Sequence, residues 1–235
     1  MKKSGKLFGI GVGPGDPELI TKKAIRIINE ADVIFTAAST KNNYSLALEI
    51  ADPYISDNAD IQNLSFPMIK DKLKSAKAWN SNAEKISAVL KQGKNAAFIT
   101  LGDPVTYSTF GYILMAMEKV MPNADIEIVP GITSFHAAAA RCNQILVEAE
   151  ETLAIASGAY GGSHIRDIAE KVDKIAIVKA YKNTKDLIKA LKETGFYEKS
   201  VAVSKCGREG ENIIQDIDDL ETREPDYWTL ILASK

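Results

Sequence analysis

A cluster of short polar side chains follows an apolar stretch near the middle of the chain. The apolar run Ala96–Leu101 predicts a buried strand, and Gly102 and Pro104 predict a sharp turn after it. Asp103 between them could cap the turn or bind a cationic or hydroxylated ligand. Hydroxyl and aromatic side chains continue the segment at Thr106, Tyr107, Ser108 and Thr109. Capping needs only some of these groups, so we expect a small ligand to approach the backbone here.

Two other turns rich in glycine and proline follow predicted strands, at Gly11–Pro17 and Pro130–Ser134. A dinucleotide fingerprint fails in the first turn, because Pro14 or Asp16 stands where the third glycine is required. The acidic residue expected at the end of the second strand is replaced by Thr36–Ser39. Without a Gly-Lys-Ser/Thr sequence, a nucleoside triphosphate cradle is excluded as well. The turn is either a flexible connection or a loop whose backbone approaches a ligand closely.

The composition is that of an ordinary globular protein of 235 residues, with 46% hydrophobic and 26% charged residues. A net charge of −2 favours neither nucleic acid nor an anionic membrane as partner. The two cysteines, Cys142 and Cys206, and the two histidines, His136 and His164, are scattered, so we expect free thiols and no protein-bound metal. The basic start is followed by neither a signal sequence nor a membrane span, so we expect a cytoplasmic protein.

Strands and helices alternate in the first half, which predicts a mostly parallel sheet with helices on both faces. Asp16 and Pro17 should begin the first of these helices. The expected strands are Leu7–Val12, Asp32–Phe35, Ile61–Phe66, Ala96–Leu101 and Ile126–Val129. The expected helices are Glu18–Asn29, Tyr44–Ile50, Lys70–Gln92, Tyr107–Met121 and Phe135–Arg141.

The second half has more closely spaced strands, so some of them should be antiparallel. The expected strands are Thr152–Ala156, Lys174–Val178, Val201–Lys205, Asn212–Gln215 and Tyr227–Ala233, and the expected helices are Gly162–Lys171 and Thr184–Thr194. We therefore predict two α/β domains, residues 1–132 and 133–235.

Basic residues gather after two strands of the second half. A surface role is the ordinary interpretation of each, but together with Arg141 they could line a cleft and attract carboxylates. They are Lys179, Lys182, Lys185, Lys205 and Arg208. For His136, we expect a partly buried structural histidine and not a catalytic base, although its place near Pro130–Ser134 keeps it a candidate. We find no Ser-His-Asp or Cys-His nucleophile arrangement.

Three motifs in this order resemble the tetrapyrrole methylase family: Gly11–Pro17, Leu101–Pro104 and Val129–Ser134. These are S-adenosylmethionine-dependent methyltransferases of vitamin B12 and sirohaem synthesis. Further segments are most similar to the precorrin-2 or cobalt-factor-II C20-methyltransferases within the family. They are Phe66–Met68, Thr106–Gly111, Ser134–Arg141, Val178–Asn183 and Tyr227–Thr229.

The resemblance implies a homodimer of chains with two αβα domains, the class III methyltransferase fold, and S-adenosylmethionine bound in the cleft between the domains. The implied cofactor contacts are Pro14, Gly102, Asp103, Val105, Thr106, Thr133, Ser134, Ala180, Cys206 and Thr229. Cys206 would contact the cofactor through its backbone. The carboxylates of the tetrapyrrole would be bound by Arg141, Lys179, Lys182 and Arg208.

The implied reaction moves a methyl group from the sulfonium of the cofactor to C20 of precorrin-2 or cobalt-factor II. The ring carbon is the nucleophile, so alignment and exclusion of water should contribute most. Asp103, Tyr107 and His136 are candidates for removing the C20 proton. A methylase acting at another ring position, on uroporphyrinogen III or precorrin-4 for example, and a non-catalytic tetrapyrrole-binding protein are the alternatives.

Overall fold

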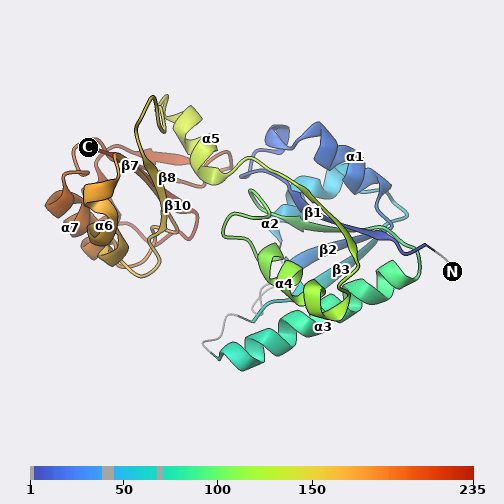
Figure 1. The fold of residues 1–235 in the computed structure, drawn as a ribbon. Helices are drawn as coiled ribbons and strands as arrows, with labels where there is room; N and C mark the ends of the chain where they lie inside the picture. Colours follow the sequence, from blue (N-terminus) through green and yellow to red (C-terminus); the bar gives the residue numbers. More distant parts are fainter. Residues whose placement is uncertain (1–2, 39–44, 68–70) are drawn as a thin grey trace. The chain divides into compact units, whose positions relative to one another are not determined.

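The chain divides into two compact units, Met1–Thr133 and Ser134–Lys235, and each is described by itself. A computed structural model describes residues 3–38, 45–67 and 71–235 (Figure 1). The sequence placed the boundary between residues 132 and 133, one residue earlier. Met68, at the end of one motif, and Tyr44 and Lys70, the predicted first residues of two helices, lie outside the described residues.

The N-terminal unit contains a five-stranded sheet in the order β3-β2-β4-β1-β5. Its strands are β1 (Lys6–Gly11), β2 (Val33–Ala38), β3 (Asp60–Ser65), β4 (Ala96–Thr100) and β5 (Asp125–Val129). Every neighbouring pair is parallel, which confirms the predicted mostly parallel sheet. β1 lies in register between β4 and β5, with Gly9 opposite Phe98 on one side and Ile128 on the other.

Helices cover both faces of this sheet (Figure 1). On one face, α1 (Lys22–Glu30) and α2 (Leu46–Ala51) pack on a cluster that contains Ile10 and Ile99. On the other face, α3 (Lys72–Lys91) and α4 (Phe110–Val120) pack on a cluster that contains Phe35 and Phe98. Successive strand residues point to opposite faces, so the near-continuous apolar strands supply both cores.

Two predicted helix starts in this unit are wrong. Asp16 does not cap α1: its carboxylate accepts from the Glu18 amide at 2.9 Å and caps a 3₁₀ turn, Pro17–Leu19. Thr21 caps α1 instead, through a 3.1 Å bond from the Ala24 amide. The second wrong start is Tyr107, the predicted first residue of α4. Tyr107 has a left-handed φ of 50°, and α4 begins at Phe110.

The C-terminal unit contains a second five-stranded sheet, in the order β6-β7-β10-β8-β9. Its strands are β6 (Leu153–Ser157), β7 (Lys174–Val178), β8 (Val201–Ser204), β9 (Asn212–Ile214) and β10 (Thr229–Ser234). β6 and β7 are parallel, whereas β10 is antiparallel to β7 and β8, and β8 is antiparallel to β9. The expectation of some antiparallel strands in this half is confirmed.

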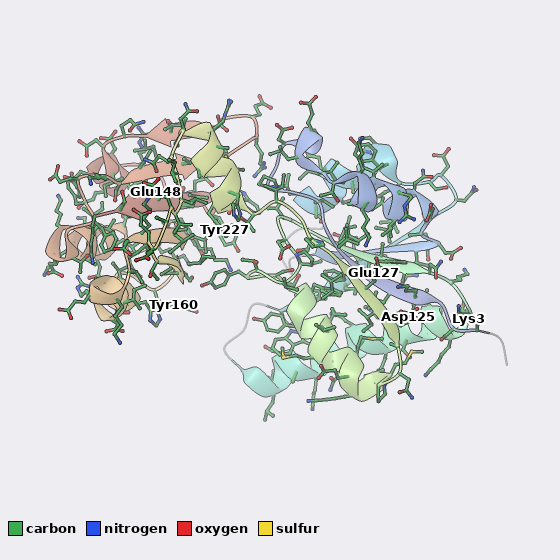
Figure 2. All side chains as sticks on the ribbon, turned by 45° about the horizontal axis from the view of Figure 1, so that its top comes forward. Lys3, Asp125, Glu127, Glu148, Tyr160 and Tyr227 are labelled. Carbon is green, nitrogen blue, oxygen red and sulfur yellow. The ribbon has the colours of Figure 1, made fainter. Side chains whose placement is uncertain are left out.

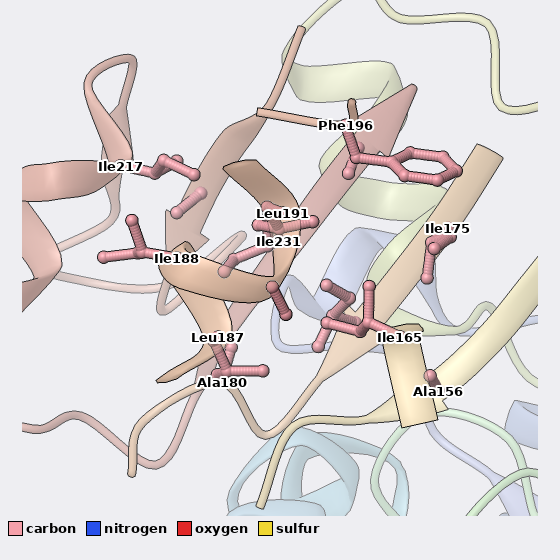
Figure 3. Packing of buried hydrophobic residues seen from close by; sticks show 14 of the residues in the cluster. Ala156, Ile165, Ile175, Ala180, Leu187, Ile188, Leu191, Phe196, Ile217 and Ile231 are labelled. Atoms are coloured by element: carbon pink, nitrogen blue, oxygen red, sulfur yellow. The ribbon is translucent and has the colours of Figure 1, made fainter. Parts of the chain in front are cut away.

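Helices also cover both faces of the second sheet. On one face, α6 (Ser163–Ile168) and α7 (Thr184–Thr194) pack on a core built around Ile175, Leu187 and Ile231 (Figure 3). The predicted helix Gly162–Lys171 is shorter than expected, because it continues as a 3₁₀ turn from Ala169. On the other face, α5 (Ser134–Arg141) packs through Phe135 and its small alanines. Further 3₁₀ turns are Asp52–Tyr54 and Ile217–Glu221.

Candidate functional site

The connections between strands reverse their direction along the first sheet between the neighbouring strands β4 and β1. The chain leaves β1 toward α1 on one face, and it leaves the neighbouring β4 toward α4 on the opposite face. In open α/β sheets, ligands bind outside the carboxyl ends of strands at such a switch point. The loops that follow β1, β4 and β5 all begin at this edge, since the three strands are parallel neighbours.

Glycines allow these three loops to touch. Gly13 and Gly102 form an isolated antiparallel bridge, with N–H···O distances of 2.7 and 3.3 Å. A Cβ at Gly11 would lie 2.4 Å from the carbonyl oxygen of Gly102, and one at Gly131 would lie 2.1 Å from the same atom. Only glycine fits at positions 11 and 131 without moving the backbone, so the motifs identified in the sequence form one structural unit.

The Asp103 carboxylate ties two of the loops together. Its Oδ1 accepts hydrogen bonds from the Val105 amide at 2.9 Å and the Thr106 hydroxyl at 3.2 Å. Its Oδ2 accepts from the Gly131 amide at 3.1 Å, and the residue is only 8% exposed. The geometry supports a role in anchoring the loops, because both oxygens are already bound to donors within the protein.

Space remains beside the backbone of this loop. Gly102 has a φ of +69°, and a Cβ built there would meet only the Ile132 carbonyl oxygen, at 3.9 Å. Val105 and Tyr107 beyond it are 63% and 52% exposed. A ligand can therefore approach the backbone at Gly102 and the side chains that follow, which fits the cofactor contacts expected from the sequence.

The other predicted residues of this region have mixed environments. Pro14 is buried, whereas Thr133 and Ser134 are partly exposed. Ser134 begins α5, and His136 follows in its first turn with its ring 4.7 Å from the Phe135 ring. His136 is exposed, so the expectation that it is partly buried is wrong.

The C-terminal unit has a pocket of its own, of about 260 Å³, at the carboxyl ends of β7 and β8 and the start of β10. Two predicted cofactor residues meet there, because the Ala180 amide donates to the Thr229 carbonyl at 2.8 Å. The Thr229 hydroxyl is buried and lies 2.7 Å from that of Ser204. Lys205, one of the basic residues expected to line a cleft, also lines the pocket, whereas the sequence prediction missed other lining residues, among them Tyr181, Ser204, Asn212, Arg223 and Asp226.

Cys206, the third cofactor residue predicted in this unit, is not among the residues that line this pocket. Its side chain is 6% exposed and packs in the cluster under α5. Burial, together with nearby Glu211, raises the pKa of the Cys206 thiol to about 11. The thiol therefore stays protonated at neutral pH, and only the backbone of this residue is suited to bind a ligand.

The basic residues proposed for substrate carboxylates have different surroundings. Arg141 is ion-paired, with its Nε 2.7 Å from Glu211 Oε1. Lys179 has a left-handed φ of 58°, and burial lowers the pKa of its ammonium group. Lys182 and Arg208 lie over aromatic rings, 5.1 Å from the centre of Tyr181 and 5.2 Å from that of Trp228, respectively.

The fold and the three glycine motifs together are typical of one class of methyltransferases. Comparison with known proteins identifies the family. The family described as Tetrapyrrole (Corrin/Porphyrin) Methylases matches residues 6–221, so the chain belongs to this family.

Among the described residues, no helix is both long and apolar enough to span a membrane.

Relatives within the family match almost the whole chain. The chain is 31% identical to cobalt-precorrin-2 C(20)-methyltransferase of Salmonella typhimurium, covering 99% of this chain and 97% of the relative. It is 35% identical to a probable cobalt-precorrin-2 C(20)-methyltransferase of Methanocaldococcus jannaschii, covering 98% and 96%.

Solved structures share the fold. A cobalt precorrin-4 methyltransferase superposes with a TM-score of 0.74 at 25% identity, covering 97% of this chain and 94% of that one. A Thermus thermophilus uroporphyrin-III C-methyl transferase, complexed with S-adenyl homocysteine, gives a TM-score of 0.69 at 19% identity, covering 98% of both chains. The two-domain α/β fold expected from the motifs is confirmed.

Proposed function

We propose that this protein is a methyltransferase that transfers a methyl group from S-adenosylmethionine to C20 of precorrin-2 or cobalt-factor II in cobalamin synthesis. The observation that carries the proposal is the match to two relatives with a C(20)-methyltransferase name, at 31% and 35% identity over nearly their whole length. The proposal includes a homodimer, which the family resemblance implies, and a cytoplasmic location, which the sequence analysis expects.

The cofactor is proposed to contact the same residues that the motifs indicated. In the N-terminal unit these are Pro14, Gly102, Asp103, Val105, Thr106, Thr133 and Ser134, and in the C-terminal unit Ala180, Cys206 and Thr229. Support comes from the space beside Gly102 and from the pocket that Ala180 and Thr229 share. S-adenosylmethionine supplies an electrophilic methyl group with a neutral thioether as leaving group.

The protein's own contribution is to bind, orient and exclude water. Asp103 keeps the loop after β4 bound to the loop after β5, so the backbone at Gly102 is preorganised. Effective molarities for well-aligned reactants correspond to about 7–11 kcal/mol, so alignment alone can supply much of the rate enhancement. Asp103 is therefore assigned to positioning, and Tyr107 and His136, both exposed, are the candidates for accepting the C20 proton.

Cationic side chains are proposed to bind the substrate carboxylates. The candidates are Arg141, Lys179, Lys182 and Arg208, and the Arg141 guanidinium is ion-paired with Glu211. Reversing the charge at a residue that binds only the substrate, as in Lys179→Glu, should raise the substrate KM much more than the cofactor Kd. Equal effects on both constants would contradict the assignment of Lys179.

The deciding experiment is turnover of precorrin-2 and cobalt-factor II side by side. We expect release of S-adenosylhomocysteine and a product heavier by one methyl group, with NMR placing that methyl at C20. Methylation at another ring carbon would support the alternative methylases of the same family. Binding of either tetrapyrrole without release of S-adenosylhomocysteine would support a non-catalytic binding protein instead.

A further inference from the structure

Three aromatic rings form a continuous row on the C-terminal unit. The Tyr181 and Tyr227 ring centres are 5.2 Å apart, and those of Tyr227 and Trp228 are 5.0 Å apart, both pairs in edge-to-face geometry. Tyr181 comes from the loop after β7, whereas Tyr227 (labelled in Figure 2) and Trp228 directly precede β10. We call these three residues the aromatic row.

The aromatic row is partly open to solvent. Tyr227 is 41% exposed and Trp228 is 38% exposed. Edge-to-face pairs of this kind are common inside cores, where the rings lose contact with water. Here the rings keep apolar surface available for a ligand. Tyr181 also lines the pocket that holds Ala180 and Thr229, so the row borders the proposed cofactor residues of this unit.

Positive charges lie at both ends of the row. Lys182 Nζ lies over the Tyr181 ring, and the Arg208 guanidinium lies over the Trp228 ring. Among the described residues, Nη1 of Arg208 is buried and has no hydrogen-bond partner. A buried guanidinium nitrogen without a partner is costly, and a carboxylate is its best partner.

Two acidic residues, Glu224 and Asp226, line the pocket beside Tyr181. Asp226 Oδ1 accepts the Trp228 amide at 2.9 Å, and its Oδ2 lies 3.7 Å from Lys205 Nζ. This carboxylate is therefore already engaged by a backbone donor and a lysine. Lys182 and Arg208 lie directly over rings of the aromatic row, so the surface is complementary to an anionic ligand with a large unsaturated ring.

We propose that the aromatic row, with Lys182 and Arg208, binds the macrocycle of a polycarboxylate tetrapyrrole. The rings of Tyr181, Tyr227 and Trp228 would contact the macrocycle, and the two cations would bind carboxylates at its periphery. This inference rests on the proposed function for the class of ligand, and it adds three aromatic side chains that contact the macrocycle to Lys182 and Arg208, the cations already proposed for the substrate carboxylates.

The test uses the full-length protein and two separate probes, uroporphyrin III and S-adenosylhomocysteine, in calorimetry. Trp228→Leu and Tyr181→Leu should each weaken uroporphyrin III binding about 5- to 30-fold, the range expected for losing a ring contact of about 1–2 kcal/mol. Trp228→Leu should change S-adenosylhomocysteine affinity less than twofold, and unaltered circular dichroism spectra should show that both variants are folded. Trp79→Leu is the matched control, because Trp79 lies in the other unit, stacked on Tyr112 at 4.1 Å.

A charge variant tests the second half of the inference. Arg208→Gln should weaken uroporphyrin III binding and make it less sensitive to salt, since one ion pair with the ligand is lost. Arg26→Gln, on the exposed face of α1, is its control and should leave both properties unchanged. Wild-type affinity for uroporphyrin III in Trp228→Leu and Tyr181→Leu would overturn the inference, as would no binding by the wild-type protein.

The outcomes for this inference and for the proposed function are separable. If the wild-type protein methylates precorrin-2 or cobalt-factor II and the two leucine variants keep its substrate KM, the inference fails and the function stands. If the wild-type protein methylates neither substrate but loses uroporphyrin III affinity in both variants, the function fails and the inference stands.

Discussion

Gly131 is the residue at which three loops approach most closely, and a single methyl group tests that contact. In Gly131→Ala the new Cβ would lie 2.1 Å from the Gly102 carbonyl oxygen and 2.8 Å from the backbone of Gly11. Backbone atoms must move to relieve such an overlap, so we expect a loss of about 1–3 kcal/mol in the free energy of unfolding, measured by urea titration.

The control for that variant is Gly111→Ala. Gly111 lies in α4, where a Cβ would have no atom within 4 Å. Alanine is favoured over glycine inside a helix, so this variant should gain about 0.5–1 kcal/mol. A Gly131→Ala protein as stable as the wild type, with unchanged affinity for S-adenosylhomocysteine, would contradict the tight packing of the three loops.

Asp103 provides the second test at the scale of a residue. In Asp103→Asn, one amide oxygen can still accept the Val105 and Thr106 bonds, but the NH₂ group would face the Gly131 amide, a donor against a donor. Leaving that buried amide unpaired should cost about 1–3 kcal/mol of unfolding free energy and weaken S-adenosylhomocysteine binding in calorimetry.

The pH dependence of Asp103→Asn separates positioning from proton transfer. If Asp103 only anchors the loops, the variant should lower kcat/KM by a similar factor at every pH. Disappearance of one limb of the pH–rate profile would instead identify Asp103 as the base.

At the scale of elements, two capping residues near the start of α1 cap different elements. Thr21 caps α1 and Asp16 caps only the preceding 3₁₀ turn. Thr21→Ala should therefore cost about 1 kcal/mol of unfolding free energy. Asp16→Ala should cost less, because its turn contains three residues. The order of the two losses in urea titrations checks this assignment, and the reverse order would support Asp16 as the main cap.

The sheets were predictable because apolar runs and turn residues mark strands directly. The helix starts were less predictable, since the left-handed Tyr107 leaves no signal in residue type, and Asp16 and Thr21 are both good caps. The three glycine loops were found from their motifs. The C-terminal pocket was not, because its residues meet only through the order β7-β10-β8, in which the last strand inserts between two earlier ones.

At the scale of the whole molecule, both units contain carboxylates whose pKa values are lowered. In the N-terminal unit, Lys23 and Lys6 lower the pKa of Glu127 to about 2. Ion pairs and backbone amides likewise lower the pKa values of four carboxylates in the C-terminal unit: Glu151, Asp186, Glu211 and Asp218.

These lowered pKa values predict that acid destabilises both units. A carboxylate whose pKa is lowered by folding stabilises the protein above its unfolded pKa of about 4, and that stabilisation is lost as the pH falls toward the folded value. We therefore expect urea midpoints to fall between pH 7 and pH 3 in both units.

The two tryptophans make this measurable, because one lies in each unit. Trp79→Phe leaves Trp228 to report on the C-terminal unit, and Trp228→Phe leaves Trp79 to report on the N-terminal unit. The fluorescence midpoints of both variants should drop on acidification. High salt should reduce the drop, since the ion pairs are largely exposed and therefore screened. A midpoint that stays constant between pH 7 and pH 3 would mean that these carboxylates do not set the acid stability of the unit on which the tryptophan reports.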